Sequence, residues 1–237
     1  MDLSIVIPVY NEEQILERSL NEVLSFFSSE NLTWELIVVN DGSTDGTEGM
    51  LDGLQERIHL LNIIHFDRNR GKGAAVREGF RQANGDYMLF FDIDLSTPLS
   101  TFDAFWPRRE ERTVLIGSRA LSMSRVLTHQ TKLKESTGKL GNLTTRALLP
   151  LPFHDTQCGF KLYAACFRSL LHLAVVNNAA FDIEWLLIAH VNGLAIEEMP
   201  VTWSNRPSTR FGLPSYLTAV YDLLTIMYRY RKGEYNF

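Results

Sequence analysis

Short apolar runs alternate with segments of helical periodicity along the first part of this chain. The apolar runs lie at 3–9, 34–39, 58–66 and 86–91, and amphipathic patterns fill the intervals between them. This alternation predicts buried strands joined by right-handed crossover helices. The chain is therefore expected to fold as an α/β protein, in a Rossmann-like arrangement with a central, mostly parallel sheet flanked by helices.

The pattern loosens after Pro98, but no linker, repeat or low-complexity tract divides the chain. We expect one domain over 1–237, in which 1–95 and 96–237 form two halves that share one sheet. The elements expected in the second half are a strand at 114–117, a basic helix-prone stretch at 122–149, helical or mixed structure at 160–173 and 182–192, a strand at 195–201, and an amphipathic helix at 216–231.

Charge and composition exclude several classes of function. The chain has 23 Lys and Arg residues against 28 Asp and Glu residues, a formal charge of −5, which disfavours a nucleic-acid partner. Cys158 and Cys166 are too few for a disulfide framework, and residues 1–4 lack the pattern of a signal peptide. No uncharged apolar stretch approaches the roughly 18 residues of a membrane-spanning helix. We therefore expect a cytoplasmic protein.

A polar cluster follows each of the first four apolar runs, at 10–12, 41–45, 67–73 and 92–94. Each cluster alone is typical of a helix cap or a turn, and Asn11 is expected to cap the first helix. In open parallel sheets, however, ligands bind beyond the carboxyl ends of the strands. The four clusters are therefore expected to converge on one crevice.

Asp92 and Asp94 form a D-x-D pair directly after a buried apolar run. At the end of a strand both carboxylates can approach one hard cation. Carboxylate oxygens, phosphate oxygens and water form the ligand set that Mg²⁺ or Mn²⁺ prefers. The pair is therefore predicted to bind Mg²⁺ or Mn²⁺ and to take part in catalysis.

Motifs along nearly the whole chain resemble the family 2 glycosyltransferases, which have the GT-A fold. In the first half these are IPVYNE at 7–12, VVNDGSTD at 38–45, NRGKG at 69–73 and FDIDLSTP at 91–98. In the second half they are DTQCGFKLY at 155–163, FDIEWL at 181–186, VTW at 201–203 and STR at 208–210. The second set resembles the polyprenyl-phosphate hexosyltransferase branch, and within it the dolichyl-phosphate glucosyltransferases.

The resemblance implies that the first half, 1–95, binds a nucleotide sugar. Glu12 and Asp41 would hold the ribose and the base, and Asp92 and Asp94 would grip the diphosphate through the metal. The residues implied in the first half of the nucleotide-sugar site are Pro8, Tyr10, Glu12, Asp41, Arg70 and Lys72.

The implied acceptor is a polyprenyl phosphate, which would attack the anomeric carbon of the donor sugar opposite the leaving group and so invert its configuration. A lipid phosphate arrives already ionised and needs cations rather than a general base. The second half, 96–237, offers such cations. The residues predicted to contact the acceptor phosphate are Lys132, Lys134, Lys139, Arg146, Arg206 and Arg210.

Four polar residues of the second half have two alternative roles. Asp155, Gln157, Asp182 and Glu184 either line the donor-sugar pocket, or one of the carboxylates is the general base for a hydroxyl acceptor. Sugar binding is favoured, because a base is superfluous for a phosphate nucleophile. Cys158 is interpreted as a small buried filler and not as a nucleophile.

A lipid acceptor requires contact with a membrane surface or with an integral-membrane partner. One face of the C-terminal helix is apolar and is followed by basic residues, which fits a helix lying in the membrane interface. Packing of this face on the protein core is the equal alternative. The residues of the face are Leu217, Val220, Tyr221, Leu224 and Tyr228. On the first interpretation the protein is peripheral at the cytoplasmic face of the membrane.

The leading hypothesis is transfer of a hexose, glucose from UDP-glucose, to a polyprenyl or dolichyl phosphate. One alternative is a glycosyltransferase that acts on a sugar hydroxyl in surface polysaccharide synthesis. Another is a non-catalytic nucleotide-sugar sensor, although the intact Asp92 and Asp94 argue against it. A nucleotidyltransferase is disfavoured, because 8–12 lacks a glycine-rich basic loop.

Overall fold

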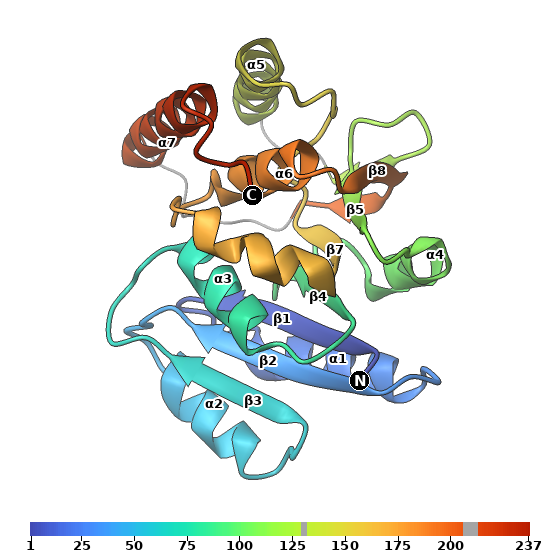
Figure 1. Ribbon diagram of the computed structural model, residues 1–237. Coiled ribbons are helices and arrows are strands. Elements are labelled where there is room, and N and C mark those ends of the chain that lie inside the picture. Colours follow the sequence, from blue (N-terminus) through green and yellow to red (C-terminus); the bar gives the residue numbers. More distant parts are fainter. Residues whose placement is uncertain (129–131, 206–212) are drawn as a thin grey trace.

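A seven-stranded sheet runs through the centre of the computed structural model, which describes residues 1–128, 132–205 and 213–237 (Figure 1). The strand order is β3-β2-β1-β4-β7-β5-β8. Its strands are β1 Leu3–Val9, β2 Trp34–Asn40, β3 Leu61–His65, β4 Tyr87–Phe91, β5 Thr113–Ser118, β7 Phe160–Ala164 and β8 Ala195–Pro200. A separate two-stranded sheet pairs β6 Arg125–Thr128 with β9 Thr202–Ser204.

Helices cover both faces of this sheet (Figure 1). The α-helices are α1 Leu16–Ser28, α2 Thr47–Gln55, α3 Lys72–Gln82, α4 Phe102–Phe105, α5 Lys132–Leu148, α6 Phe181–Val191 and α7 Leu213–Arg231. The 3-10 segments are η1 Leu99–Thr101, η2 Trp106–Arg108 and η3 Ala165–Leu173.

Strand directions confirm the predicted fold class. β1 pairs in parallel with β2 and β4, β2 with β3, and β5 with β8. Only β7 runs against its neighbours within the main sheet of the described residues, lying between β4 and β5. The two halves of the chain therefore meet inside one sheet, at β4 and β7.

Alternating side chains of the central strands enter two separate cores, because successive residues of a strand point to opposite faces. Val6 packs on the side of α3 and α6, whereas Ile5 and Ile7 pack on the side of α1 and α2. All seven residues of β1 are buried, as expected of a strand covered on both faces.

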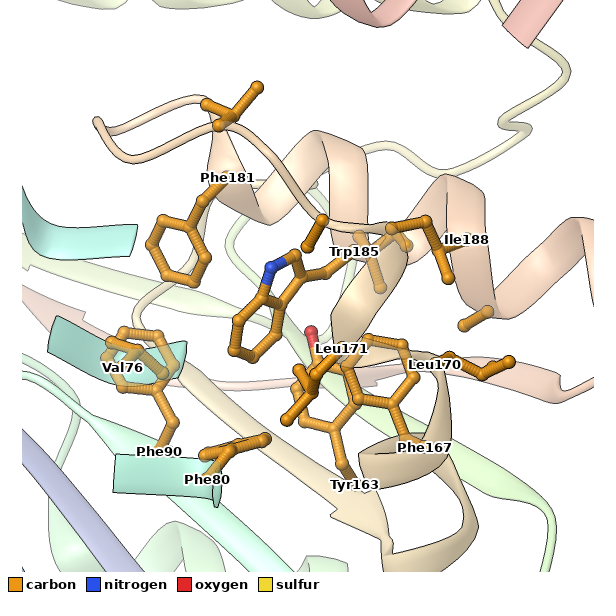
Figure 2. Packing of buried hydrophobic residues seen from close by; sticks show 14 of the residues in the cluster. Val76, Phe80, Phe90, Tyr163, Phe167, Leu170, Leu171, Phe181, Trp185 and Ile188 are labelled. Carbon is orange, nitrogen blue, oxygen red and sulfur yellow. The ribbon is translucent and has the colours of Figure 1, made fainter. Parts of the chain in front are cut away.

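Trp185 is the centre of the first core (Figure 2). Its ring centroid lies 5.1 Å from that of Phe80 and 5.2 Å from that of Phe181. Tyr163 and Phe167 complete the aromatic cluster around it. This packing fixes the amino end of α6 against α3 and β4, which matters because polar residues of these elements meet in the crevice described below.

Two local predictions differ from the structure. Asn11 does not cap α1, because it adopts φ 53° and its side-chain oxygen accepts a hydrogen bond from the Thr44 N–H at 2.7 Å. Residue Ile15 stands at the start of the helix instead. In the stretch 122–149, residues 125–128 form β6, because they find a pairing partner in β9, far along the chain.

Candidate functional site

The loops after β1 and β2 are bonded to each other. The Asn11 N–H donates to Ser43 Oγ at 2.9 Å, and the Glu12 N–H donates to Thr47 Oγ1 at 2.8 Å. In return, the Thr44 N–H donates to the Asn11 side chain. These bonds fix the predicted residues Tyr10 and Glu12 beside the second loop. Pro8 is buried just before them in β1, in register with Val39.

Asp41 ties the second loop to the third. It is 3% exposed, and its oxygens accept the Arg70 N–H at 2.7 Å and the Gly71 N–H at 2.9 Å. Burial raises the pKa of Asp41, although these two N–H groups and the Arg70 charge oppose the shift. Asp41 therefore positions the segment that leads into α3.

A hollow of about 610 Å³ lies at the carboxyl end of β3. The guanidinium of Arg70 stands 4.3 Å from the centre of the Phe66 ring beside it. The hollow is lined by His65, Phe66, Asp67, Arg68 and Arg70. It combines an aromatic surface with cations, next to the loop that Asp41 holds.

Asp92 and Asp94 both stand on the partly exposed side of the loop after β4, whereas Ile93 and Leu95 between and after them are buried. Asp92 Oδ1 lies 2.7 Å from the Nζ atom of Lys72, the first residue of α3. Asp94 Oδ1 accepts the Ser96 N–H at 2.8 Å. Both carboxylates are therefore partly open to solvent, and Asp92 is paired with Lys72.

Lys72 lies among three carboxylates. Burial would lower the pKa of its ammonium, but Asp92, Asp182 and Asp94 together raise it. The three acids come from two elements, the loop after β4 and the amino end of α6. The structure thus brings four of the predicted site residues to one place.

Beneath this group lies a fully buried ion pair between Lys161 and Asp182, 0% and 4% exposed at their side chains. Lys161 Nζ also donates to the Cys158 carbonyl at 2.8 Å. Burial raises the pKa of Asp182, and the charges of Lys161 and Lys72 oppose this shift. The ammonium groups of Lys72 and Lys161 lie 5.0 and 5.9 Å from the centre of the Phe90 ring. Charged side chains of opposite sign from α3, β7 and α6 therefore lie next to one another.

Asp155 is held by Arg119, a residue that the sequence interpretation missed. Arg119 Nε and Nη2 donate to the two oxygens of Asp155 at 2.6 and 2.9 Å, and its backbone N–H adds a third bond at 2.9 Å. Burial alone would raise the pKa of Asp155, but these hydrogen bonds and the Arg119 charge lower it.

Arg119 follows β5 directly and stacks at 5.3 Å on the ring of Trp203. The Asp92 charge contributes to raising the pKa of Arg119, so that this cation lies within electrostatic reach of the D-x-D pair. The signal that would have found it is the one used for the first four strands, a polar residue directly after a strand of the parallel sheet.

One predicted residue, Glu184, does not reach this crevice. Glu184 is 0% exposed and accepts hydrogen bonds from the Val175 and Val176 N–H groups and from the Tyr235 hydroxyl, so it lies in the core. Gln157 is exposed, and its side chain reaches the Ala179 carbonyl at 3.4 Å. Cys158 is buried and its pKa is raised to about 11 by burial, which confirms it as an inert filler.

The predicted acceptor cations are only partly covered by the structure. Arg146 is exposed near the end of α5. Lys132, Lys134 and Lys139 lie on α5, but their side chains are outside the described residues, as are Arg206 and Arg210 entirely.

The donor set at Asp92 and Asp94 suits a hard divalent cation. The described residues contain no group of three or more His, Cys, Asp or Glu side chains that is placed to hold a metal, so the site would rest on these two carboxylates. Two carboxylates supply fewer ligands than the six that Mg²⁺ takes. The pair can therefore hold such an ion together with oxygens from water and a bound phosphate.

Comparison with known proteins identifies the chain. A family model described as Glycosyl transferase family 2 matches residues 4–169. The chain belongs to this family. The glycosyltransferase is 32% identical over 255 residues to the dolichyl-phosphate beta-glucosyltransferase of Saccharomyces cerevisiae, covering 99% of this chain and 76% of the relative. It is likewise 32% identical over 266 residues to the human protein of that name, covering 99% and 77%.

Solved structures support the same fold for this family 2 member. A mannosyl-3-phosphoglycerate synthase from Rubrobacter xylanophilus aligns with a TM-score of 0.69 and 17% identity, covering 99% of this chain and 75% of that one. A glucosyl-3-phosphoglycerate synthase from Mycobacterium tuberculosis in complex with UDP gives 0.65 and 20%, covering 95% and 80%. These likenesses confirm the predicted GT-A fold.

Proposed function

We propose that this glycosyltransferase transfers glucose from UDP-glucose to a dolichyl or polyprenyl phosphate, with inversion and with the help of Mg²⁺ or Mn²⁺. Relatives at about 30% identity over nearly the whole chain are named dolichyl-phosphate beta-glucosyltransferases, which supports the sugar and the acceptor. The UDP complex of a structural neighbour agrees with a uridine nucleotide donor.

The observation that carries the proposal is the state of the two possible general bases. Asp155 is engaged on both oxygens by Arg119, and its lowered pKa makes it a weak base. Asp182 is fully buried in its pair with Lys161. A sugar-hydroxyl acceptor would need one of these carboxylates free, whereas an ionised phosphate needs neither.

Arg119 fits the role of a cation that receives the acceptor phosphate. Asp155 takes Nε and Nη2, and within the described part of the chain Nη1 has no hydrogen-bond partner. A guanidinium held on one edge by a carboxylate is pre-oriented to bind a phosphate on its other edge. Arg119 thus adds a described cation to those that the sequence predicts.

On the donor side, a metal held by Asp92 and Asp94 would neutralise charge on the leaving diphosphate. Lys72 would add a second positive charge at the same point. Glu12, Tyr10, Arg70 and the hollow at the end of β3 would bind the nucleoside, with Asp41 holding the Arg70 segment in place.

The position of α7 supports contact with a membrane surface. Its apolar face does not pack on the core: Leu217 is 67% exposed and Tyr221 is 70% exposed, and Val220, Leu224 and Tyr228 are exposed as well. The opposite side of the helix, with Ile226, is buried. Among the described helices, none has the length and apolarity to cross a bilayer. We infer that α7 lies in the membrane interface, which makes the enzyme peripheral.

The test is a transfer assay with radiolabelled UDP-glucose, Mn²⁺ and dolichyl phosphate in detergent micelles. We expect a glucolipid from dolichyl phosphate and none from dolichol, which presents a hydroxyl instead of a phosphate. Arg119→Met should lower the rate about a hundredfold or more by the loss of a charge-assisted phosphate contact.

Arg112→Met is the matched control, because Arg112 precedes the opposite, amino end of β5 and its guanidinium donates to the Asn192 carbonyl. Its rate should stay near that of the wild type. Glucosylation of a polysaccharide hydroxyl in preference to the lipid phosphate would contradict the proposal. Tight UDP binding without any transfer would indicate a nucleotide-sugar sensor instead.

A further inference from the structure

The two oxygens of Asp92 have different surroundings. A Cβ atom built on Gly159 would stand 2.1 Å from Asp92 Oδ2, so this oxygen packs directly on the glycine backbone. The Asp92 N–H donates to the Gly159 carbonyl at 3.3 Å, which holds the two segments together. Gly159 thus crowds Oδ2 on one side, whereas at Oδ1 the Nζ atom of Lys72 stands 2.7 Å away, where a metal cation would compete with it.

The backbone of Lys72 is fixed on both sides. Gly71 has φ 99°, gives its N–H to Asp41, and approaches the Asn177 carbonyl so closely that an added Cβ would lie 2.4 Å from that oxygen. A Cβ on Gly73 would lie 2.5 Å from Phe181 Cβ. Only the side chain of Lys72 can move, and it is a flexible chain with about one third of its surface exposed.

We propose that Lys72 is a resident counter-ion of Asp92, which a divalent cation displaces and which then binds the donor diphosphate. The inference rests on the donor and metal of the proposed function, and it adds an exchange between two cations at one carboxylate oxygen. Without metal, the ammonium neutralises Asp92 in a site of three carboxylates. With metal and nucleotide, the freed ammonium has a new anion within reach.

This exchange couples the binding of metal to the binding of nucleotide. A metal that takes Oδ1 would break the Lys72–Asp92 pair, and the diphosphate would compensate by accepting the released ammonium. By linkage, UDP strengthens Mn²⁺ binding by the same factor by which Mn²⁺ strengthens UDP binding. Part of this factor comes from direct contact between metal and phosphate, and Lys72 supplies the rest.

Titration calorimetry of UDP with and without Mn²⁺ tests the exchange. In the metal-free wild type Lys72 is engaged by Asp92, so Lys72→Met should change the affinity for UDP less than about twofold. In saturating Mn²⁺ the same variant should bind UDP about tenfold more weakly, within the usual range of coupling factors. Lys72→Met should also bind Mn²⁺ more tightly than the wild type when UDP is absent.

A second variant gives an effect of the opposite sign. Asp92→Asn releases Lys72 without a metal, so its metal-free affinity for UDP should rise several-fold above that of the wild type. Adding Lys72→Met to Asp92→Asn should abolish this gain. Lys72→Arg should retain most of the coupling, because a guanidinium can also pair with both carboxylate and phosphate.

Lys232→Met is the control for net charge, because it removes one lysine that lies against Tyr228, at the end of α7. It should leave all affinities unchanged. Equal loss of UDP affinity in Lys72→Met with and without Mn²⁺ would overturn the proposal, as would an Asp92→Asn variant with unchanged metal-free UDP binding. None of these measurements involves the lipid acceptor, so they can succeed even where transfer to dolichyl phosphate fails.

Discussion

The two halves of the chain hold their buried carboxylates in different ways. In 1–95, Asp41 accepts two backbone N–H groups, and the buried Glu35 accepts the Ser4 hydroxyl at 2.6 Å and the Asn84 N–H at 2.7 Å. In 96–237, Asp155 is paired with Arg119 and Asp182 with Lys161. In these examples neutral donors bind the buried carboxylates of the first half, whereas cations pair with those of the second half.

The pKa values of these groups follow from their partners and their burial. Burial raises the pKa of Asp41 because neutral N–H groups compensate it only in part. The guanidinium of Arg119 reverses the effect of burial at Asp155. Asp182 is the intermediate case, since deep burial still raises its pKa despite two nearby ammonium groups. A carboxylate in this fold is thus a weak base when a guanidinium holds it.

The largest effect on stability is expected where a charged pair is broken. Lys161→Met leaves the Asp182 carboxylate buried without its cation, and should lower the free energy of unfolding by about 3–5 kcal/mol. Asp41→Asn in the first half should cost less, about 1–3 kcal/mol, because the groups that donate directly to Asp41 are neutral N–H groups. Urea unfolding at pH 7, followed by circular dichroism, measures both.

The double variant Lys161→Met/Asp182→Leu separates the cost of an unpaired charge from the loss of packing. Replacing both partners by apolar side chains of similar volume should recover most of the stability. If Lys161→Met lowers the free energy of unfolding no more than Asp41→Asn does, then charged and neutral partners of the buried carboxylates do not differ in energy.

A large effect on catalysis is expected where the two halves touch. Gly159→Ala places a methyl group against Asp92 Oδ2 and must shift this carboxylate. On the proposed function Asp92 is a catalytic group, and displacing such a group by about 1 Å costs on the order of a hundredfold in rate, so kcat for glucosyl transfer should fall by about that factor. Gly138→Ala in α5 is the control, because a Cβ there meets no atom within 4 Å. A Gly159→Ala enzyme with normal kcat would show that the position of Asp92 is not critical.

The sequence predicts the fold of the first half, 1–95, well because its signals are local. A buried run followed by polar residues defines each strand end, and parallel strands bring these ends together. The meeting of Lys72 with Asp92, and the closeness of Asp94, follow from this rule alone. The fold class follows from the same alternation.

The second half, 96–237, is less predictable because its decisive contacts join residues that are far apart in the sequence. Arg119 and Asp155 are 36 positions apart, and Lys161 and Asp182 are 21 apart, so no local pattern reveals the pairs. Glu184 was predicted to line the sugar pocket together with Asp182, but residues two positions apart on a helix point in different directions, and Glu184 faces Tyr235 instead. The strand β7 was not distinguished from a helix, because a short apolar run fits both.

The pH dependence of stability should distinguish Asp41 from Asp155. An acid whose pKa is lowered by folding stabilises the native state above its unfolded pKa of about 3.9, and this contribution is lost as the pH falls through the folded pKa. The stability advantage of the wild type over Asp155→Asn should therefore shrink below about pH 4. An acid with a raised pKa behaves in the opposite way, so the advantage over Asp41→Asn should grow between neutral pH and about pH 4.

Urea unfolding of the wild type and both variants at several pH values between 7 and 3 measures these differences directly. Groups that titrate equally in wild type and variant cancel from each comparison. If the stability difference between wild type and variant changes with pH in the same direction for Asp41→Asn and Asp155→Asn, the assignment of neutral and charged partners is contradicted.

Glu184 shows whether the direction of a buried carboxylate's pKa shift depends on its half of the chain or on the type of its hydrogen-bond partner. Glu184 lies in the second half, 96–237, yet its hydrogen-bond donors are neutral. They are two backbone N–H groups and the Tyr235 hydroxyl at 2.8 Å. Its pKa is raised by burial, as at Asp41 and unlike at Asp155.

Tyr235→Phe removes one of three neutral donors to Glu184, and should cost about 1–2 kcal/mol of unfolding free energy, less than the loss of a cation. The remaining N–H groups of Val175 and Val176 still satisfy the carboxylate. The loss of a donor to the ionised form also raises the Glu184 pKa further, so the deficit of the variant should narrow as the pH falls from 7 toward 4.5. The same urea titration measures this loss of unfolding free energy. A loss as large as that of Lys161→Met would mean that burial, and not the charge of the lost partner, determines the loss.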